Sequence, residues 1–368
     1  MPGSIMTGEK DYLAALLEEV RGETAPVSLM EVCGTHTVAI ARSGLRELVP
    51  SNLRLLSGPG CPVCVTAQGD IDAVLELARQ PQVTLATFGD MMRVPGSTTS
   101  LQEERSRGAD VRIVYSPLDA LEMARALPDR QVVFLGIGFE TTAPTVAVAI
   151  LQAAAQGITN FSVWSLHKVV PPALEALFAD PDVRVDGLIC PGHVSAVIGA
   201  EPYQAVVSRY GKACVITGFE TRDLLEGIVM LLRQLRRGRP QVEIQYRRVV
   251  RPQGNPVARG VLQQVFTTVP ARWRGLGTIP DSGLAVSAAF QAWDARVRFP
   301  LPEREDQPIP GCSCGEVLCG KITPRQCRLF GRGCTPLRPV GPCMVSQEGA
   351  CAAYYRFSPG KETDGDGH

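Results

Sequence analysis

Short apolar runs alternate with amphipathic stretches from residue 9 to about residue 240. The apolar runs are rich in β-branched and aliphatic residues and have the length of buried strands; they cover residues 27–30, 53–56, 83–88, 111–115, 132–137, 161–165, 188–190 and 213–217. The stretches with helical periodicity are residues 9–22, 69–80, 118–127, 144–156, 171–179 and 222–236. Because strands and helices alternate, the pattern predicts an α/β fold with mostly parallel sheets.

A weak internal repeat indicates two similar units within this region. The tetrapeptide Gly-Phe-Glu-Thr occurs at residues 138–141 and 218–221, each time between an apolar run and a helical stretch. We therefore expect two similar Rossmann-like lobes, residues 25–127 and 128–238. The repeat would lie at the carboxyl edge of a sheet, where ligands usually bind. Glu140 is thus a candidate for lining a cleft, although a helix cap is an alternative role for it.

The composition changes after residue 238. Residues 242–250 are strand-like and residues 255–266 are helical, but from Pro308 onward Gly, Pro and Cys dominate. Such a segment has too little apolar material to fold without a covalent or metal staple. We expect a third domain that joins the N-terminal helix, within residues 1–24, to a loop-rich C-terminal region, within residues 239–368.

The charge balance excludes some classes of partner. The 368 residues include 37 Lys and Arg and 37 Asp and Glu, so no overall field favours nucleic acid or an anionic membrane. The longest apolar runs, 132–139 and 146–155, are shorter than the roughly 18 residues that a membrane span needs. The first ten residues lack the pattern of a secretory signal. We expect a cytoplasmic protein that binds neither nucleic acid nor membranes.

Cysteine is concentrated near the C-terminus, where seven of the 12 cysteines lie within residues 312–351. A reducing compartment disfavours a static disulfide framework. Zinc ribbons usually present their ligands in close pairs, whereas a [4Fe–4S] cluster accepts wider and irregular spacing. The spacing therefore favours a cluster over zinc or buried thiols, which stay as alternatives. The four cysteines we favour as ligands are Cys312, Cys327, Cys334 and Cys351.

A C-x-x-C turn, formed by Cys61 and Cys64, follows the apolar run 53–56. A thiolate near a helix N-terminus has a lowered pKa and is both a nucleophile and a metal ligand. Two such thiols can form a redox-active disulfide or bind a soft metal. Two ordinary buried thiols are the alternative, and the flanking Gly and Pro residues make it less attractive.

Three further residues follow apolar runs and carry weaker signals. Cys33 and His36 lie three residues apart on a Gly-containing turn. His36 could ligate a metal or stabilise the Cys33 thiolate, but a structural role fits the sequence equally well. His193 could line a cleft or bond to the backbone of a turn. Cys190 and Cys214 have the surroundings of core residues.

Taken together, these motifs resemble the HypD family of [NiFe]-hydrogenase maturation proteins. The matching blocks span residues 31 to 351, nearly the whole chain, and their joint occurrence is highly specific; Ala67, where Pro is expected, is a small departure. The blocks are Cys33-Gly-Thr-His36, Gly58-Pro-Gly-Cys-Pro-Val-Cys64, Phe88-Gly-Asp-Met-Met-Arg-Val-Pro-Gly96, Gly136-Ile-Gly-Phe-Glu-Thr-Thr-Ala-Pro-Thr145, Pro191-Gly-His-Val-Ser195, Cys327-Arg-Leu-Phe-Gly-Arg-Gly-Cys334 and Gly341-Pro-Cys-Met-Val-Ser-Gln-Glu-Gly349.

The resemblance implies a scaffold that assembles the Fe(CN)2CO part of the hydrogenase active site. In such a scaffold an Fe(II) ion that receives CN and CO ligands is held together with a HypC-like chaperone, and cyanide is accepted from a HypE-like donor. The resemblance makes Cys33 the iron-holding thiolate and the Cys61 and Cys64 thiols a redox or iron-binding pair. The four C-terminal cysteines named above would bind a [4Fe–4S] cluster, and Cys314 and Cys343 would form a second thiol pair near it.

Two other functions are compatible with the same cysteines. One is a thiol–disulfide oxidoreductase in which a cluster reduces Cys61 and Cys64. The other is a structural adaptor that binds zinc. Release of cyanide from a thiocyanate requires two electrons, whereas a cluster normally transfers one, so a dithiol pair is a suitable partner for the scaffold function.

Overall fold

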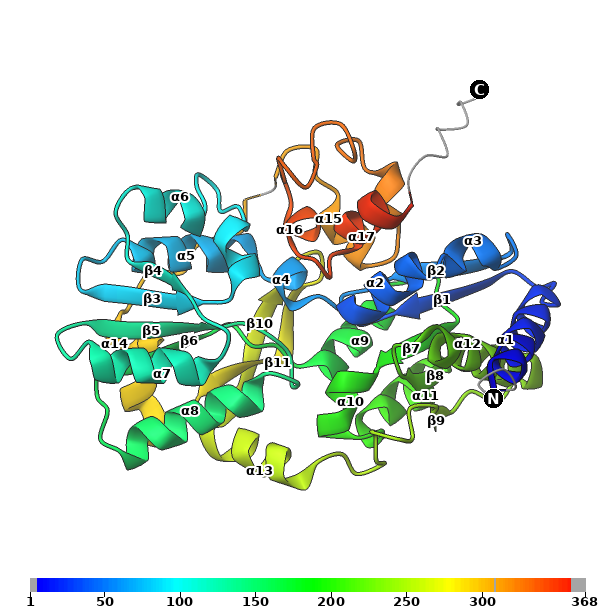
Figure 1. Cartoon of the computed structure of the whole chain (residues 1–368), viewed down its shortest axis with the longest axis horizontal. Helices are drawn as coiled ribbons and strands as arrows, with labels where there is room; N and C mark the ends of the chain where they lie inside the picture. The colour runs from blue at the N-terminus through cyan, green and yellow to red at the C-terminus, as the bar shows by residue number, and fades with distance from the viewer. Residues whose placement is uncertain (1–4, 308, 359–368) are drawn as a thin grey trace.

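The computed structural model describes residues 5–307 and 309–358. Two parallel sheets form the two halves of the molecule, and a cysteine-rich region lies above the junction between them (Figure 1). The prediction of an α/β fold with mostly parallel sheets is confirmed.

The first sheet has five parallel strands, in the order β2-β1-β7-β8-β9. Its inner strands are buried along their length, which explains their continuous apolar sequences. The strands are β1 (Val27–Glu31), β2 (Leu53–Ser57), β7 (Gly187–Pro191), β8 (Ala213–Thr217) and β9 (Val242–Ile244). The helices of this half are α1 (Ile5–Arg21), α2 (Gly34–Arg42), α3 (Leu45–Leu48), α9 (Val170–Ala179), α10 (Gly192–Ile198), α11 (Gln204–Tyr210) and α12 (Thr221–Arg237), with a 3-10 turn η2 (Glu201–Tyr203).

The second sheet has four parallel strands, in the order β4-β3-β5-β6. In its hydrophobic core, apolar side chains of the strands pack against apolar side chains of the helices that follow them. The strands are β3 (Val83–Thr87), β4 (Val111–Ile113), β5 (Gln131–Gly136) and β6 (Phe161–Ser165). The helices are α5 (Gln68–Ala78), α6 (Leu101–Ser106), α7 (Pro117–Ala126) and α8 (Ala143–Ala155), with a 3-10 turn η1 (Gly89–Arg93).

Strand pairing groups the chain differently from the two expected lobes, 25–127 and 128–238. Strand β3 pairs with β5, so the expected boundary between residues 127 and 128 lies inside the second sheet. Strand β1 pairs with β7, more than 150 residues away in the sequence. Local periodicity locates strands but carries no information on which strands pair, and this explains the difference.

An antiparallel hairpin that the sequence pattern did not reveal connects the two halves. It consists of β10 (Phe266–Trp273) and β11 (Gly277–Val286) and is drawn in yellow in Figure 1. Single bridges join Trp273 to Thr66 and Gly283 to Lys168. The strand-like stretch 242–250 forms a strand only over β9, and the helical stretch 255–266 forms α13 (Pro256–Val265). The hairpin is followed by η3 (Ala288–Trp293) and α14 (Ala295–Arg298).

The cysteine-rich region consists of turns and four short helical segments. It packs against α2 through α17 and against α4 (Pro62–Val65) through α15 and α16. The segments are α15 (Cys314–Leu318), η4 (Pro324–Gln326), α16 (Pro342–Val345) and α17 (Ala350–Phe357).

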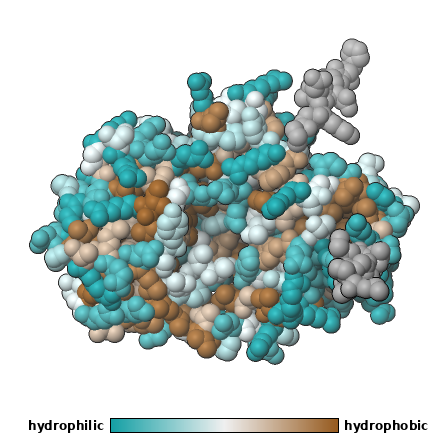
Figure 2. Space-filling view, in the orientation of Figure 1, coloured by the Kyte–Doolittle hydropathy of each residue, from teal (hydrophilic) through white to brown (hydrophobic). Residues whose placement is uncertain are grey.

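Hydrophilic residues cover most of the face seen in Figure 2, and the apolar residues on it are scattered. Within residues 5–307 and 309–358, every helix is too short or too polar to cross a bilayer.

Candidate functional site

Two cysteine-bearing loops meet at the carboxyl edge of the first sheet. Strands β1 and β2 are parallel neighbours, and Glu31 at the end of β1 lies in register with Ser57 at the end of β2. The loops that follow these strands are joined by two hydrogen bonds of 2.8 Å: Gly58 N–H donates to the Glu31 carbonyl, and Gly34 N–H donates to the Gly60 carbonyl. A Cβ atom at Gly60 would overlap the backbone of Cys33, so only glycine permits this contact.

Cys33 is the N-cap residue of α2, and its thiol is free. Its side chain is nearly buried, with 8% of the residue exposed. Burial raises the pKa of the Cys33 thiol to about 12, the nearby Glu348 carboxylate adds to this effect, and the backbone N–H of His36 opposes it. The thiol is therefore neutral in the metal-free protein, and a bound metal ion would have to displace its proton.

The imidazole of His36 does not contact Cys33 but points to the end of β8. Its Nε2 atom lies 3.0 Å from the Gly218 carbonyl oxygen and 3.0 Å from Thr217 Oγ1, and its ring centroid is 4.6 Å from that of Phe219. Burial lowers the pKa of His36 to about 4, so the ring is neutral. His36 therefore has the structural role that the sequence also allowed. Its ring links α2 to the end of β8 and does not act on the Cys33 thiolate.

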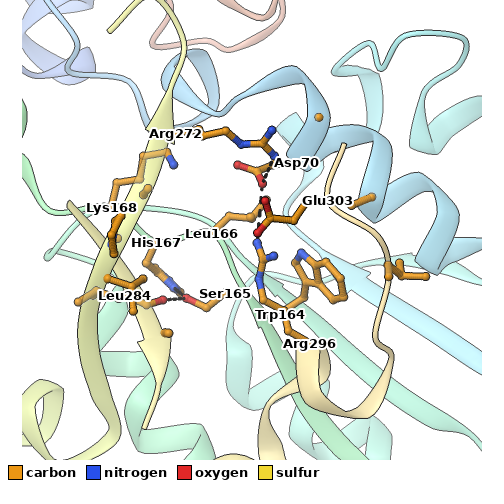
Figure 3. Close-up of a pocket in the computed structure, with 18 of the residues that line it drawn as sticks. Asp70, Trp164, Ser165, Leu166, His167, Lys168, Arg272, Leu284, Arg296 and Glu303 are labelled. Atoms are coloured by element: carbon orange, nitrogen blue, oxygen red, sulfur yellow. Dashed lines mark hydrogen bonds and ion pairs between the residues drawn. The ribbon is translucent and has the colours of Figure 1, made fainter. Parts of the chain in front are cut away.

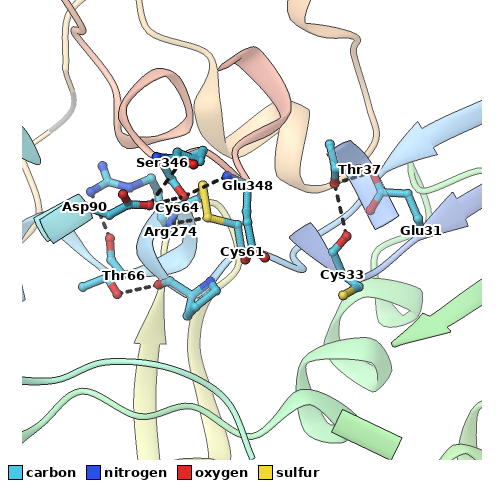
Figure 4. Close-up of a disulfide and its surroundings, with 12 residues drawn as sticks. Glu31, Cys33, Thr37, Cys61, Cys64, Thr66, Asp90, Arg274, Ser346 and Glu348 are labelled. Carbon is cyan, nitrogen blue, oxygen red and sulfur yellow. Dashed lines mark hydrogen bonds between the residues drawn. A yellow bond between two sulfur atoms is a disulfide. The ribbon is translucent and has the colours of Figure 1, made fainter. Parts of the chain in front are cut away.

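Cys61 and Cys64 form a disulfide that spans the single turn of α4 (Figure 4). Their Cα atoms are 5.2 Å apart, within the usual range for this bond. Cys61 is 3% exposed and Cys64 is fully buried. Pro62 occupies the first position of the helix, and Cys61 Sγ accepts a 3.2 Å hydrogen bond from Cys64 N–H. The predicted pair is thus close enough to cycle between a dithiol and a disulfide.

The hairpin holds the segment that follows this disulfide. Arg274 N–H donates a 2.8 Å hydrogen bond to the Val65 carbonyl, and the Arg274 guanidinium donates a 2.9 Å bond to the Thr66 carbonyl (Figure 4). On its other side, α4 packs against α15 and α16 of the cysteine-rich region. The disulfide therefore lies between the hairpin and that region.

The four cysteines favoured as cluster ligands line one cavity. Its remaining walls are largely apolar. Gly341 is required beside it, because a Cβ atom there would lie 2.6 Å from Cys314 Sγ and 2.7 Å from Cys312 Sγ. Across the described ranges, no three His, Cys, Asp or Glu side chains converge on a position for a single metal ion. The cavity is lined by Cys312, Ser313, Cys314, Val317, Cys327, Leu329, Phe330, Cys334, Met344 and Cys351.

Cys343 lies between this cavity and the disulfide. It is fully buried on α16, within side-chain hydrogen-bonding reach of Cys314 and Cys351. Because α16 also packs against α4, the two predicted thiol pairs belong to neighbouring elements. Cys319 is separate, since its thiol donates a 3.4 Å hydrogen bond to the Gly275 carbonyl and it does not line the cavity. Cys190 and Cys214 are fully buried in the first sheet, as expected for core residues.

A cleft of about 470 Å³ opens between the two sheets, and Cys33 is part of its wall. It corresponds to the hollow near the middle of the face in Figure 2. His193 also lines it, stacked 4.0 Å from the ring of Phe219. Glu140 does not line the cleft. Its Oε1 atom accepts a 3.0 Å hydrogen bond from Val170 N–H at the start of α9, and burial raises its pKa to about 7. Glu140 therefore has the helix-capping role that was its alternative, at the start of α9.

The sequence reasoning missed two acidic residues of this cleft, Asp90 and Glu348. Thr35 Oγ1 donates a 2.7 Å hydrogen bond to Glu348 Oε1, and Asp90 Oδ2 lies 3.4 Å from Ser346 Oγ. These contacts tie the cysteine-rich region to the entrance of the cleft. Both acids fall within blocks of the family resemblance, but neither has a spacing that indicates a specific chemistry.

Comparison with known proteins agrees with this arrangement. A family model described as "HypD: Hydrogenase formation hypA family" matches residues 10–358. The hydrogenase maturation factor HypD of Rhodobacter capsulatus is 48% identical over 352 residues, which are 94% of this chain and 93% of that protein. The protein of the same name from Escherichia coli K12 is 47% identical over 333 residues, 90% of this chain and 89% of that protein. That from Rhizobium leguminosarum bv. viciae is 45% identical over 368 residues, with 98% and 94% covered. Because the match extends over almost the entire sequence at such identity, the chain belongs to the HypD family of hydrogenase maturation factors.

Proposed function

We propose that this protein is the redox-active scaffold on which the Fe(CN)2CO unit of [NiFe] hydrogenase is assembled. It would work with a HypC-like chaperone, which shares the iron, and with a HypE-like donor, which supplies cyanide. The observation that carries the proposal is the direct backbone contact between the Cys33 loop, which opens on the cleft, and the loop that bears Cys61 and Cys64. The thiol proposed for metal binding and the thiols proposed for electron transfer therefore lie on one structural unit.

Cys33 is the proposed ligand of the iron that is being assembled. Fe(II) with cyanide and CO ligands is a soft centre, and a thiolate is a suitable donor for it. Metal binding would release the thiol proton, and the largely apolar walls of the cleft would keep water from the iron. Access from the cleft leaves room for the chaperone to supply a further ligand.

Cys61 and Cys64 are the proposed two-electron pair for cyanide release. Their dithiol form would react with a thiocyanate so that the sulfur–carbon bond of the thiocyanate breaks. The donor sulfur then leaves as a thiol, cyanide leaves as HCN, and Cys61 and Cys64 become a disulfide. The two electrons and the two protons of the products all come from the dithiol, so the step is balanced. Return to the dithiol takes two electrons and two protons.

The proposed ligands of a resident [4Fe–4S] cluster are Cys312, Cys327, Cys334 and Cys351. Their thiols and the apolar side chains around a common cavity fit such a group, which is larger than a single metal ion. When bound, the cluster supplies electrons one at a time. Cys314 and Cys343 would hold protons and electrons between this cavity and α4, since α15 and α16 both touch α4.

Infrared spectroscopy of anaerobically purified protein, in complex with its chaperone, tests the proposal. Stretching bands of iron-bound cyanide and CO are expected. The Cys61→Ala variant should lose these bands but keep the visible absorbance of the C-terminal cluster, whereas the Cys214→Ala variant, altered at a core cysteine, should keep both. Normal cyanide bands in Cys61→Ala would contradict the role of the pair.

Metal analysis separates the alternative functions. Zinc without acid-labile sulfide would support a structural adaptor. Iron and sulfide without cyanide or CO bands, combined with reduction of a protein disulfide, would support a thiol–disulfide oxidoreductase.

A further inference from the structure

A second cavity, of about 370 Å³, lies apart from the cysteines (Figure 3). It is enclosed by the end of β6, the start of α5, the hairpin β10–β11 and α14. Its volume is in the range of sites that bind small organic molecules. The proposed scaffold function uses none of the residues that line it.

Lys168 is the unusual residue of this cavity. It is 2% exposed, and its backbone is fixed by a 3.0 Å hydrogen bond to the Gly138 carbonyl and by the bridge to Gly283 on β11. Its Nζ atom lies 5.7 Å from the centroid of the Trp273 ring. Burial lowers the pKa of Lys168 to about 8. In the described part of the chain its ammonium group has no carboxylate within ion-pair distance.

Two arginines beside Lys168 share one carboxylate. Asp70 Oδ1 lies 3.3 Å from Arg272 Nη2 and 3.8 Å from Arg296 Nη2, and Arg296 also lies 4.7 Å above the Trp164 ring (Figure 3). Asp70 is thus shared by two arginines; Asp70 and Asp306 act on the Lys168 charge only from beyond ion-pair distance, while Arg272 and Arg296 oppose that charge.

The other charged side chains of the wall act at groups other than Lys168. Asp294 caps α14 by accepting a 2.8 Å hydrogen bond from Arg296 N–H, and its carboxylate also stabilises the Arg296 charge. Glu303 is exposed at the rim, and the Arg304 guanidinium pairs with Glu76 outside the cavity. Among the described residues the buried Lys168 ammonium therefore has no direct ion pair, and a bound counterion would stabilise it.

The rest of the lining also suits an anion with an apolar body. The indole N–H of Trp164 is buried and has no acceptor among the described residues, and an indole can only donate. Val269, Leu284 and Leu301 contribute apolar side chains to the wall. We propose that this cavity binds a small organic anion whose carboxylate or phosphate group is held by Lys168, flanked by Arg272 and Arg296.

Calorimetric titration of the full chain with three probes tests the proposal. Benzoate carries a carboxylate, phenyl phosphate carries a phosphate, and benzamide is the uncharged counterpart of benzoate. At least one of the two anions should bind, about tenfold or more tighter than benzamide. The better anion indicates which head group the site prefers. Absence of binding by both anions, or equal binding of benzamide, would overturn the proposal.

Two lysine variants locate the binding. Lys168→Met keeps an unbranched side chain of nearly the same length and removes the charge, and it should weaken anion binding about tenfold or more. Lys212→Met is the matched control, because Lys212 also lies 5.7 Å from an aromatic ring, that of Phe178, but outside the cavity. Equal anion binding by Lys168→Met and the wild type would refute the role of Lys168.

A measurement on the wild type covers the case in which Lys168→Met does not fold. Acetic anhydride should acetylate Lys168 more slowly in the presence of the bound anion, as followed by peptide mass spectrometry, while the rate at Lys212 stays the same. An unchanged rate at Lys168 would contradict the proposal. Neither measurement depends on hydrogenase maturation, so its result is independent of the proposed function.

Discussion

The backbone N–H of Gly34 donates a 2.8 Å hydrogen bond to the carbonyl oxygen of Gly60. This bond joins the residue after Cys33 to the residue before Cys61. Together with the bond from Gly58 N–H to the Glu31 carbonyl, it makes the two cysteine-bearing loops one unit. The distance between the proposed iron ligand and the proposed redox pair is therefore set by backbone contacts.

Replacement of Gly60 by alanine should separate these loops. The new Cβ atom would overlap the backbone of Val32 and Cys33, which cannot move without disturbing β1. We expect a loss of about 2 kcal/mol in the free energy of unfolding. We also expect loss of the cyanide and CO bands, with the C-terminal cluster absorbance retained. Chemical denaturation and infrared spectroscopy measure the two effects.

Gly260→Ala is the control for this change. Gly260 lies within α13, and a Cβ atom there would meet nothing within 4 Å. Since alanine favours a helix over glycine by about 1 kcal/mol, this variant should be as stable as the wild type or more so. If Gly60→Ala behaved in the same way, the contact between the loops would have no importance for function.

Cys327 and Cys319 allow a matched test of the cysteine-rich cavity. Cys327 lines the cavity, whereas Cys319 belongs to the same region but bonds to the Gly275 carbonyl instead. Cys327→Ser should lower the iron and acid-labile sulfide content, because serine is a poor substitute for a cluster thiolate. Cys319→Ser should keep both, since a hydroxyl can make the same hydrogen bond. Equal metal content in the two variants would exclude Cys327 as a ligand.

Much of the fold could be predicted from periodicity. The run 161–165 forms β6 with the same bounds, and the run 213–217 forms β8. The hairpin could not be predicted, because Pro270 and Pro280 interrupt its strands and most of its residues are exposed or only partly buried. Pro270 lies at a shift of register between Val269 and Ala271, where a missing N–H group is tolerated.

The candidate site was only partly accessible from the sequence. Cysteine spacing and the position of Cys33 after an apolar run were sufficient to select the thiols that the structure brings together, although their chemical roles stay predictions. The directions of His36 and Glu140 could not be inferred, because each depends on the neighbouring element that the side chain meets. Lys168 carried no signal, since its burial depends on a hairpin that is distant in the sequence.

Thr35 and Glu348 connect α2 to the cysteine-rich region, and removal of their hydrogen bond should loosen that contact. Thr35→Val keeps the shape of the side chain and removes the donor of the 2.7 Å bond to Glu348. We expect a local loss of about 1 kcal/mol, seen as faster hydrogen exchange of the backbone amides in residues 346–350.

Thr221→Val serves as the comparison for this variant. Thr221, at the start of α12, and Thr35, on α2, both line a groove separate from the cleft, and the Thr221 hydroxyl makes no hydrogen bond within the described residues. Exchange in residues 346–350 should therefore match the wild type. If both variants exchanged alike, the bond to Glu348 would not hold the region in place.

Glu104 should make the second half of the molecule sensitive to acid. Its carboxylate is 4% exposed and accepts hydrogen bonds from Arg79, at 2.8 and 2.9 Å, and from Arg107, at 2.9 Å. The Arg79 hydrogen bonds are the main cause that lowers the pKa of Glu104 from 4.5 to about 2.

Between these two pH values the unfolded chain binds a proton at this position and the folded chain does not. The stabilisation by Glu104 is therefore complete above pH 4.5 and is lost as the pH falls toward 2. Both guanidinium groups are about half exposed, so solvent screening limits the effect to about 1–2 kcal/mol.

Glu104→Gln should lower the free energy of unfolding by that amount at neutral pH and flatten its decline below pH 4.5. The control is Glu122→Gln, which alters an exposed pair with Arg125 and should change stability by less than about 0.5 kcal/mol. Denaturation curves recorded on both sides of pH 4.5 decide the question, and parallel pH profiles for Glu104→Gln and the wild type would show that this carboxylate does not contribute.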